Sequence, residues 1–211
     1  MESPALPANL GALVDETAEH HPERVAWRFI DTEIEVTFTE LRDYTHRAAN
    51  LFCGLGVRHG THVAIMSANS LACCGSWLAL ARIGAVVVSV NTRYTSRELF
   101  YVLDDAEVEY LLTETSLLPI FEGMETRPAR IVDEEHVLVI DPGATQWHKR
   151  VAAQPRQFVP ESSVGQDDLV NIQYTSGTSG FPKGCILTHR YWMLSTKIHA
   201  EDFPIALESV I

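Results

Sequence analysis

Hydrophobic positions along this chain alternate between two patterns from residue 62 to residue 113. Short apolar runs rich in β-branched residues predict strands buried on both faces, and segments with apolar residues at every third or fourth position predict helices. Strands are expected at 62–66, 85–90 and 109–113, and helices at 70–82 and 98–105. This order predicts an α/β fold with a mostly parallel, doubly wound sheet and helices on both of its faces.

Shorter elements are expected on either side of this region. Thr39 is the predicted N-cap of one helix, and Thr95 with Glu98 forms a predicted capping box. Residues 115–165 have a less regular pattern, and 154–166 are interpreted as a surface connector. The remaining elements predicted are a helix at 9–20, a hairpin of 24–30 with 33–38, a helix from 39 to the glycines at 54 and 56, strands at 137–140, 168–174 and 185–188, and a helix at 189–200.

Composition narrows the class of protein. Hydrophobic residues make up 46% of the 211 residues and charged residues 21%, as in an ordinary packed domain. Sixteen Lys and Arg against 28 Asp and Glu give a net charge of −12, which disfavours binding to nucleic acid. Nothing in the sequence indicates an oligomeric state.

Cysteine spacing and hydropathy bear on location. The four cysteines, at 53, 73, 74 and 185, form no CxxC pair, so reduced thiols are expected rather than zinc ligands or disulfides. No signal peptide is visible. The uncharged stretch 63–81 contains several polar residues and predicts a buried helix rather than a membrane span. We therefore expect a cytoplasmic protein without a transmembrane segment.

Residues suited to binding an anion gather between the last two predicted strands, in the sequence TSGTSGFPKG at 175–184. Its glycines let backbone N–H groups approach a ligand, its hydroxyls donate to anionic oxygens, and Lys183 is its only charge. Together these features favour a cradle for a polyphosphate. A flexible Ser/Gly linker is the alternative, which the flanking strands and Pro182 disfavour.

Two other phosphate-binding loops do not fit this segment. A Walker A loop has its lysine after a glycine and continues into a helix, whereas Lys183 follows Pro182 and leads towards a strand. Residues 177–180 have the wrong spacing for the G-x-G-x-x-G loop of dinucleotide-binding folds. No helix dipole is therefore expected behind the phosphate.

The sequence YTSGTSGFPKGCILTH, at 174–189, resembles the phosphate-loop signature of the adenylate-forming (AMP-dependent synthetase/ligase) superfamily. That superfamily comprises acyl-CoA synthetases, adenylation domains of peptide synthetases and firefly-type luciferases. Residues 36–70 and 78–113 are similar to its N-terminal blocks, and the sequence VNTRY within the second block favours acyl-CoA synthetases. Small departures occur at His59-Gly60-Thr61, where the family usually has Gly-Asp, and at Ser179, where threonine is commoner.

The resemblance implies an acid–thiol ligase that acts in two steps, as in fatty acid metabolism. A carboxylic acid attacks the α-phosphorus of ATP to give an acyl-adenylate and pyrophosphate, and coenzyme A then takes the acyl group, with Mg²⁺ sharing the phosphate charge. Thr175 is the candidate metal ligand, and Lys183 is the candidate catalytic residue, as a phosphate clamp and not as the lysine that activates the carboxylate. The residues expected to bind ATP are Thr175, Ser176, Gly177, Thr178, Ser179, Gly180, Pro182, Lys183 and Gly184.

The same resemblance predicts that 1–211 is a partial N-terminal AMP-binding domain with its phosphate loop at 174–184. The family's adenine and ribose segments, and the C-terminal domain with the catalytic lysine, are not found in these residues. We therefore expect the N-terminal fragment of an enzyme, inactive by itself. A truncated, non-catalytic remnant that binds a nucleotide or a partner is the alternative. The carboxylic acid is not specified.

Other candidate residues allow two interpretations each. His189 follows the loop and suits an acid or base, or a hydrogen bond at a helix start. His59 and His62 form an H-x-x-H pattern but flank a predicted turn, which disfavours a metal site. Residues 77, 78 and 80 (Trp, Leu and Leu) are assigned to the core rather than to a substrate pocket.

Overall fold

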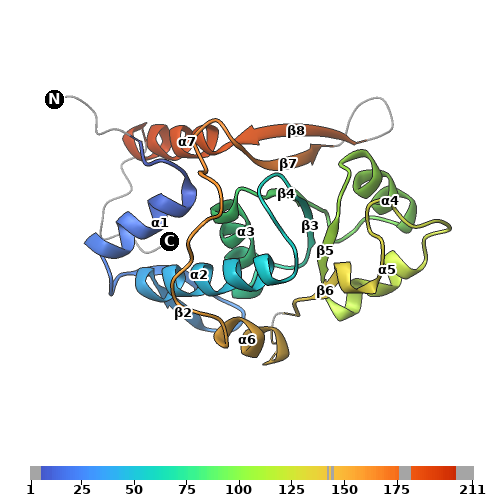
Figure 1. The fold of residues 1–211 in the computed structure, drawn as a ribbon, viewed down its shortest axis with the longest axis horizontal. Helices are drawn as coiled ribbons and strands as arrows, with labels where there is room; N and C mark the ends of the chain where they lie inside the picture. The colour runs from blue at the N-terminus through green and yellow to red at the C-terminus, as the bar shows by residue number, and fades with distance from the viewer. Residues whose placement is uncertain (1–5, 142, 144, 176–181, 203–211) are drawn as a thin grey trace.

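The computed structural model describes residues 6–141, 143, 145–175 and 182–202. Within these ranges the chain forms a six-stranded sheet, a separate two-stranded hairpin and seven α-helices (Figure 1). The strands are β1 (Val25–Phe29), β2 (Ile34–Thr37), β3 (His62–Met66), β4 (Val86–Ser89), β5 (Tyr110–Thr113), β6 (Val137–Val139), β7 (Leu169–Thr175) and β8 (Lys183–Thr188). The helices are α1 (Leu10–His20), α2 (Phe38–Gly54), α3 (Leu71–Ile83), α4 (Ser96–Asp105), α5 (Leu118–Glu122), α6 (Thr145–Ala152) and α7 (His189–Asp202).

The large sheet has the strand order β6-β5-β3-β4-β7-β8. All neighbours run parallel except β7 and β8, which are antiparallel. From β3 the chain passes through α3 to β4 on one side, and then through α4 to β5 on the other side of β3. The predicted mostly parallel, doubly wound sheet is therefore confirmed, and its topological switch point lies between β3 and β5, because the chain leaves β3 towards β4 and leaves β5 towards β6.

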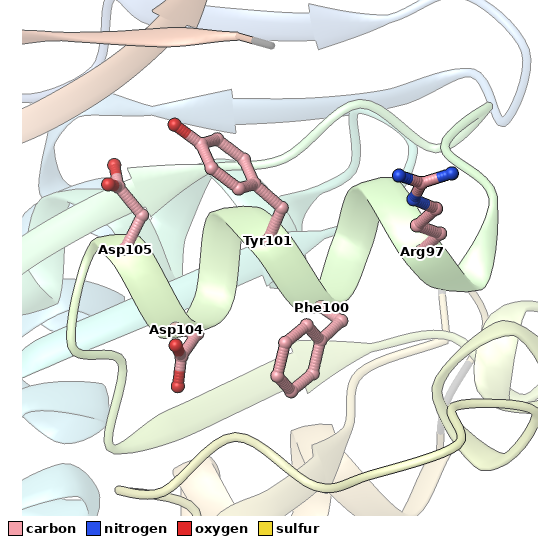
Figure 2. Close-up of a pocket in the computed structure, with 5 residues that line it drawn as sticks. All are labelled: Arg97, Phe100, Tyr101, Asp104 and Asp105. Atoms are coloured by element: carbon pink, nitrogen blue, oxygen red, sulfur yellow. The ribbon is translucent and has the colours of Figure 1, made fainter.

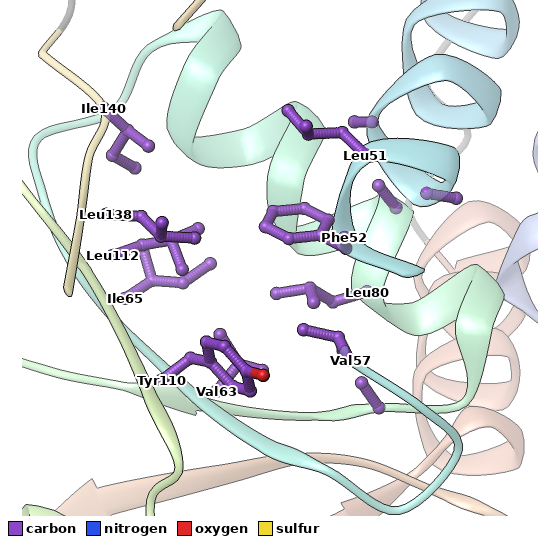
Figure 3. Packing of buried hydrophobic residues seen from close by; sticks show 14 of the residues in the cluster. Leu51, Phe52, Val57, Val63, Ile65, Leu80, Tyr110, Leu112, Leu138 and Ile140 are labelled. Atoms are coloured by element: carbon purple, nitrogen blue, oxygen red, sulfur yellow. The ribbon is translucent and has the colours of Figure 1, made fainter. Parts of the chain in front are cut away.

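Helices cover both faces of the sheet because the side chains of its strands alternate. On one face, Val63 and Ile65 of β3 pack against α2 and α3, where Phe52 and Leu80 are fully buried (Figure 3). On the other face, Met66 packs with residues of α4 and α5. Because side chains alternate along β3, Val63 and Ile65 belong to the core on one face of the sheet, and Met66 belongs to the core on the other face.

Helix starts follow the capping rules, with one correction. The N-cap of α2 is Thr37, whose hydroxyl accepts from the backbone N–H of Glu40 while the Glu40 carboxylate accepts in return. The prediction of Thr39 as the N-cap is wrong, because Thr39 lies inside the helix and its hydroxyl donates to the Pro22 carbonyl. The capping box of Thr95 with Glu98 is confirmed at α4.

The region 115–165 contains two helices that the sequence pattern did not predict, α5 and α6. Both are too short for a helical period to stand out. Helix α6 buries Trp147, whose Nε1 donates to the Tyr44 hydroxyl of α2 at 3.0 Å. Residues 154–166 contain no helix or strand, as expected of a connector, and Asn50 of α2 binds the carbonyls of residues 155 and 157 in that segment.

A partly buried ionic network joins the first three helices. Arg82 of α3 donates to both carboxylate oxygens of Asp15 of α1, at 2.6 and 2.8 Å. His46 of α2 binds the same carboxylate through Nε2 at 3.1 Å, and its Nδ1 accepts from the backbone N–H of Phe158. Because the Nδ1 of His46 accepts, its Nε2 carries the proton that faces Asp15.

Candidate functional site

The described part of the predicted phosphate loop forms the end of the β7–β8 hairpin. Thr175, the last residue of β7, is paired directly with Lys183, the first residue of β8. Pro182 and Gly184 are described as well. The predictions for Ser176, Gly177, Thr178, Ser179 and Gly180 fall outside the described residues. A strand, and not a helix, follows the loop, as the sequence predicts.

Gly184 establishes which way the hairpin residues face. A Cβ atom at Gly184 would lie 2.9 Å from a methyl carbon of Ile172 and 3.3 Å from the ring of Tyr174, so this position faces the α4 side of the sheet. Neighbouring residues of a strand face opposite sides. Thr175 and Lys183 therefore lie together on the other face, which they share with Gln173. The close approach leaves no space for a side chain at Gly184.

A pocket of about 660 Å³ lies on that same face, at the carboxyl ends of β3 and β4. We call it the switch-point pocket because β3, one of the two strands that flank the switch point, ends in it. Its volume is in the range of small-molecule sites. The residues that line it are Leu10, Trp27, Ile65, Ser67, Asn69, Cys73, Cys74, Trp77, Leu78, Ser89, Val90, Asn171, Gln173, Trp192 and Thr196. Because β7 runs parallel to β4, the end of β7 at Thr175 lies at the same edge of the sheet as this pocket.

The switch-point pocket adds a second role for two residues of α3. Leu80 is fully buried in the core, as predicted, and Trp77 and Leu78, which pack against buried clusters, also line the pocket. Trp77 also contacts Trp192 of α7 edge to face, and Trp192 donates to Asn171 of β7 at 2.9 Å. An apolar helix face looks the same in sequence whether it packs on a core or borders a pocket. The polar residues that end β3 and β4 were the available signal.

Tyr174 anchors the hairpin on the other side of the sheet. Its hydroxyl donates to the Asp105 carboxylate of α4 at 2.5 Å. Burial raises the pKa of Tyr174, and the hydrogen bond to Asp105 raises it further. Figure 2 shows Asp105 and Tyr101 on one side of α4, within a smaller pocket that Arg97 also lines. This pocket lies across the sheet from Thr175 and Lys183.

His189 begins α7 and is fully buried. Its Nδ1 accepts from the backbone N–H of Leu10 at 3.2 Å, whereas its Nε2 has no partner among the described residues. Burial lowers the pKa of His189 to about 4, against the opposing effect of the Asp168 charge. A neutral, hydrogen-bonding imidazole at a helix start is therefore the interpretation that the structure supports.

His59 and His62 do not converge on a common site. His59 lies 3.4 Å from the Asp168 carboxylate, whereas His62 contacts the backbone carbonyl of Ala106 at 2.6 Å. No group of three His, Cys, Asp or Glu side chains within the described ranges is placed to hold a metal ion. The two imidazoles of the H-x-x-H pattern therefore contact different partners.

Comparison with known proteins identifies the family. The family model of the AMP-binding enzymes matches residues 14–208. The chain belongs to this family. The chain is 30% identical over 190 residues to the crotonobetaine/carnitine–CoA ligase of Salmonella paratyphi A. The match covers 86% of the chain but only 36% of that ligase. The chain therefore spans about a third of this relative's length.

Solved structures agree with this assignment. The N-terminal domain of FACL13 from Mycobacterium tuberculosis, an inhibitor-bound crystal structure, superposes with a TM-score of 0.76 at 26% identity, covering 86% of this chain and 44% of that one. The anthranilate CoA ligase AuaEII, in complex with anthranoyl-AMP, has a TM-score of 0.79 at 24% identity, covering 96% of this chain and 37% of that one, and shows likeness of fold. The chain is thus similar in fold to part of the N-terminal domain of acyl-CoA synthetases and ligases.

Within the described residues, no helix is both long and apolar enough to cross a membrane.

Proposed function

We propose that this chain supplies the polyphosphate-binding part of an ATP-dependent acid–thiol ligase. One observation carries the proposal: Thr175 and Lys183 are paired across β7 and β8, on the face of the sheet that holds the switch-point pocket. A hydroxyl and a cation are thereby held side by side at the sheet edge where ligands bind in doubly wound folds. The family membership agrees with this role.

The proposed reaction needs stabilisation of a leaving pyrophosphate. When a carboxylate oxygen bonds to the α-phosphorus of ATP, the bond from that phosphorus to the bridging oxygen breaks, and negative charge accumulates on the departing phosphates. Lys183 places a positive charge beside that leaving group, and Thr175 donates a hydrogen bond. The β7–β8 ladder holds both residues in place beforehand, so little reorganisation is needed during the reaction.

Thr175 offers an oxygen atom that suits Mg²⁺, one of the cofactors that the family resemblance implies. The Thr175 hydroxyl is an oxygen donor of the kind that Mg²⁺ accepts, and the ion would neutralise phosphate charge when bound. Coenzyme A would supply the thiol that receives the acyl group. We also propose a cytoplasmic location, in keeping with four cysteines that are all free thiols in the structure.

Binding of magnesium pyrophosphate and of ATP to the chain tests the site directly. Isothermal titration should detect both ligands, and Lys183→Ala should weaken each roughly tenfold to hundredfold, because a hydrogen bond to a charged group contributes about 1.5–3 kcal/mol. Lys149→Ala is the matched control, since Lys149 is exposed on α6, at the opposite side of the molecule from β8 (Figure 1). Equal affinity in all three proteins would contradict the assignment of the loop.

Exchange of labelled pyrophosphate into ATP tests catalysis. With a panel of short, long and aromatic carboxylic acids, we expect no exchange above the Lys183→Ala background for the 211 residues alone. Positioning of the two reactants contributes about 7–11 kcal/mol in such reactions, and the resemblance assigns it to segments outside these residues. Exchange is expected when the chain is joined to the family's remaining segments. If neither ligand binds and no exchange occurs in that longer protein, the non-catalytic, partner-binding alternative is favoured.

A further inference from the structure

Two adjacent cysteines in the first turn of α3 border the switch-point pocket. Cys73 and Cys74 both line it, at the start of the helix that leads from β3 to β4. Cys74 also lines a second pocket of about 740 Å³, which the hairpin residue Trp27 shares. A small molecule can therefore reach Cys74 from two directions, although neither cysteine is fully exposed.

The helix start favours a thiolate at Cys74. Ser70 is the N-cap of α3, and its hydroxyl and carbonyl oxygens accept from the backbone N–H groups of Cys73 and Cys74 at 3.1 and 2.8 Å. The Cys73 thiol donates to the Cys74 sulfur, and this bond, with the nearby backbone, lowers the pKa of Cys74 against the effect of burial. The same bond and burial raise the pKa of Cys73, which keeps its proton.

The other two cysteines lack this arrangement. Burial raises the pKa of the Cys53 thiol, which stands in the last turn of α2. Cys185 is exposed on β8, away from any helix start. A pocket, a helix N-terminus and a neighbouring thiol donor therefore coincide at one cysteine of the four.

We propose that Cys74 is a thiol-modification site that forms mixed disulfides with low-molecular-weight disulfides entering the switch-point pocket. The Cys74 thiolate attacks one sulfur of the incoming disulfide, a bond forms between these two sulfurs, and the original disulfide bond breaks. The second half departs as a thiolate and takes a proton from water. The incoming disulfide is the oxidant, so no further reactant is needed.

Cys73 cannot release the adduct by closing an internal disulfide. Adjacent Cα atoms are about 3.8 Å apart, below the shortest separation of about 4.4 Å that ordinary disulfides span, and α3 keeps both residues in helical geometry. The modification therefore persists until an external thiol removes it. While it persists, the adduct occupies the space between α3, Gln173 and Trp192 and excludes other ligands from the pocket.

Oxidised glutathione is the probe for this site. The full chain is incubated with it under native conditions, and the products are followed by intact mass and by peptide mapping. We expect one glutathione per chain, on Cys74. Cys74→Ser should abolish this adduct, and Cys53→Ser, the matched control, should leave it unchanged. The rate should reach half its maximum at least one pH unit below the value of about 8.5 for free cysteine.

A second variant tests how Cys73 affects the reactivity of Cys74. Cys73→Ala removes the thiol donor, so the midpoint of the Cys74 rate profile should move up in pH while the adduct still forms. Modification of Cys185 alone, a midpoint at or above that of free cysteine, or a disulfide between residues 73 and 74 would overturn the proposal. The result does not depend on ATP binding, so failure of the proposed ligase function leaves this test intact.

Discussion

His189 accepts a hydrogen bond at Nδ1 from the backbone N–H of Leu10, which lies 179 positions earlier in the chain. The bond joins the first residue of α7, directly behind the β7–β8 hairpin, to the first residue of α1. Because the first N–H groups of a helix have no partner within it, a buried start such as that of α1 needs an acceptor from elsewhere. The imidazole is that acceptor, and it serves only while Nδ1 is unprotonated.

Removing this acceptor should destabilise the fold. His189→Leu leaves the Leu10 N–H buried without a partner, at a cost of about 1–3 kcal/mol in the free energy of unfolding. His189→Asn should recover part of the loss, since its amide oxygen is an acceptor close to the position of Nδ1. Urea unfolding measures both variants. His21→Leu, at an exposed histidine, is the control, and an equal loss there would contradict this role.

The same histidine should make stability depend on pH. Burial lowers the pKa of His189 to about 4 in the folded state, from about 6.5 in the unfolded chain. The unfolded chain then binds more protons between these values, so the contribution is complete above pH 6.5 and is lost as the pH falls towards 4. Between pH 7 and pH 5 the wild type should lose about 1–2 kcal/mol more than His189→Asn. Parallel curves for the two proteins would exclude this origin.

The pair of Arg82 and Asp15 should contribute more than the exposed ion pairs. Arg82 is 7% exposed, so Asp15→Asn leaves a buried guanidinium without its counter-charge, and we expect a loss of about 1.5–3 kcal/mol in urea unfolding. Glu35→Gln is the control, because the side chains of Glu35 and its partner Arg28 are 46% and 47% exposed. Similar losses in both variants would indicate that burial of the pair is unimportant.

Acid titration tests the same carboxylate. Burial raises the pKa of Asp15, but hydrogen bonds and charge from His46 and Arg82 outweigh it and lower the pKa to about 2. Its contribution is complete above the unfolded value of about 4 and is lost as the pH falls from there towards 2. Asp15→Asn should therefore show a smaller fall in stability across this window than the wild type, measured by thermal unfolding. A fall of the same size in both proteins would contradict the prediction.

Tyr174 should hold the base of the hairpin against α4. Tyr174→Phe removes the hydrogen bond to Asp105, at a cost of about 1 kcal/mol. Amide hydrogen exchange in β7 and β8 should quicken about fivefold, while β3 and β5 remain unchanged. Tyr191→Phe, at an exposed tyrosine of α7, is the control. Faster exchange in every strand, or in none, would show that the bond does not act locally.

Local interactions allowed several features to be predicted from sequence. The β-branched run at Val86, Val87 and Val88 can be buried on both faces only as a central strand, and β4 is one. The capping box of Thr95 with Glu98 depends on residues three apart, and it is present as predicted. The sequence also specified a strand rather than a helix after Pro182. The start of α2 shows the limit of such local predictions. Thr37 with Glu40 forms a capping box that determines where α2 begins, although Thr39 was also a possible N-cap by its sequence.

Only the tertiary structure decided which distant residues meet. The strand order that puts β4 between β3 and β7 depends on packing between segments far apart in the chain, and it alone creates the switch-point pocket. Trp77 therefore borders a pocket although its helix looks buried in sequence. The side that Thr175 and Lys183 face follows from the register of β7 with β8. Such relationships depend on long-range packing and strand registry, which a short window of sequence does not contain.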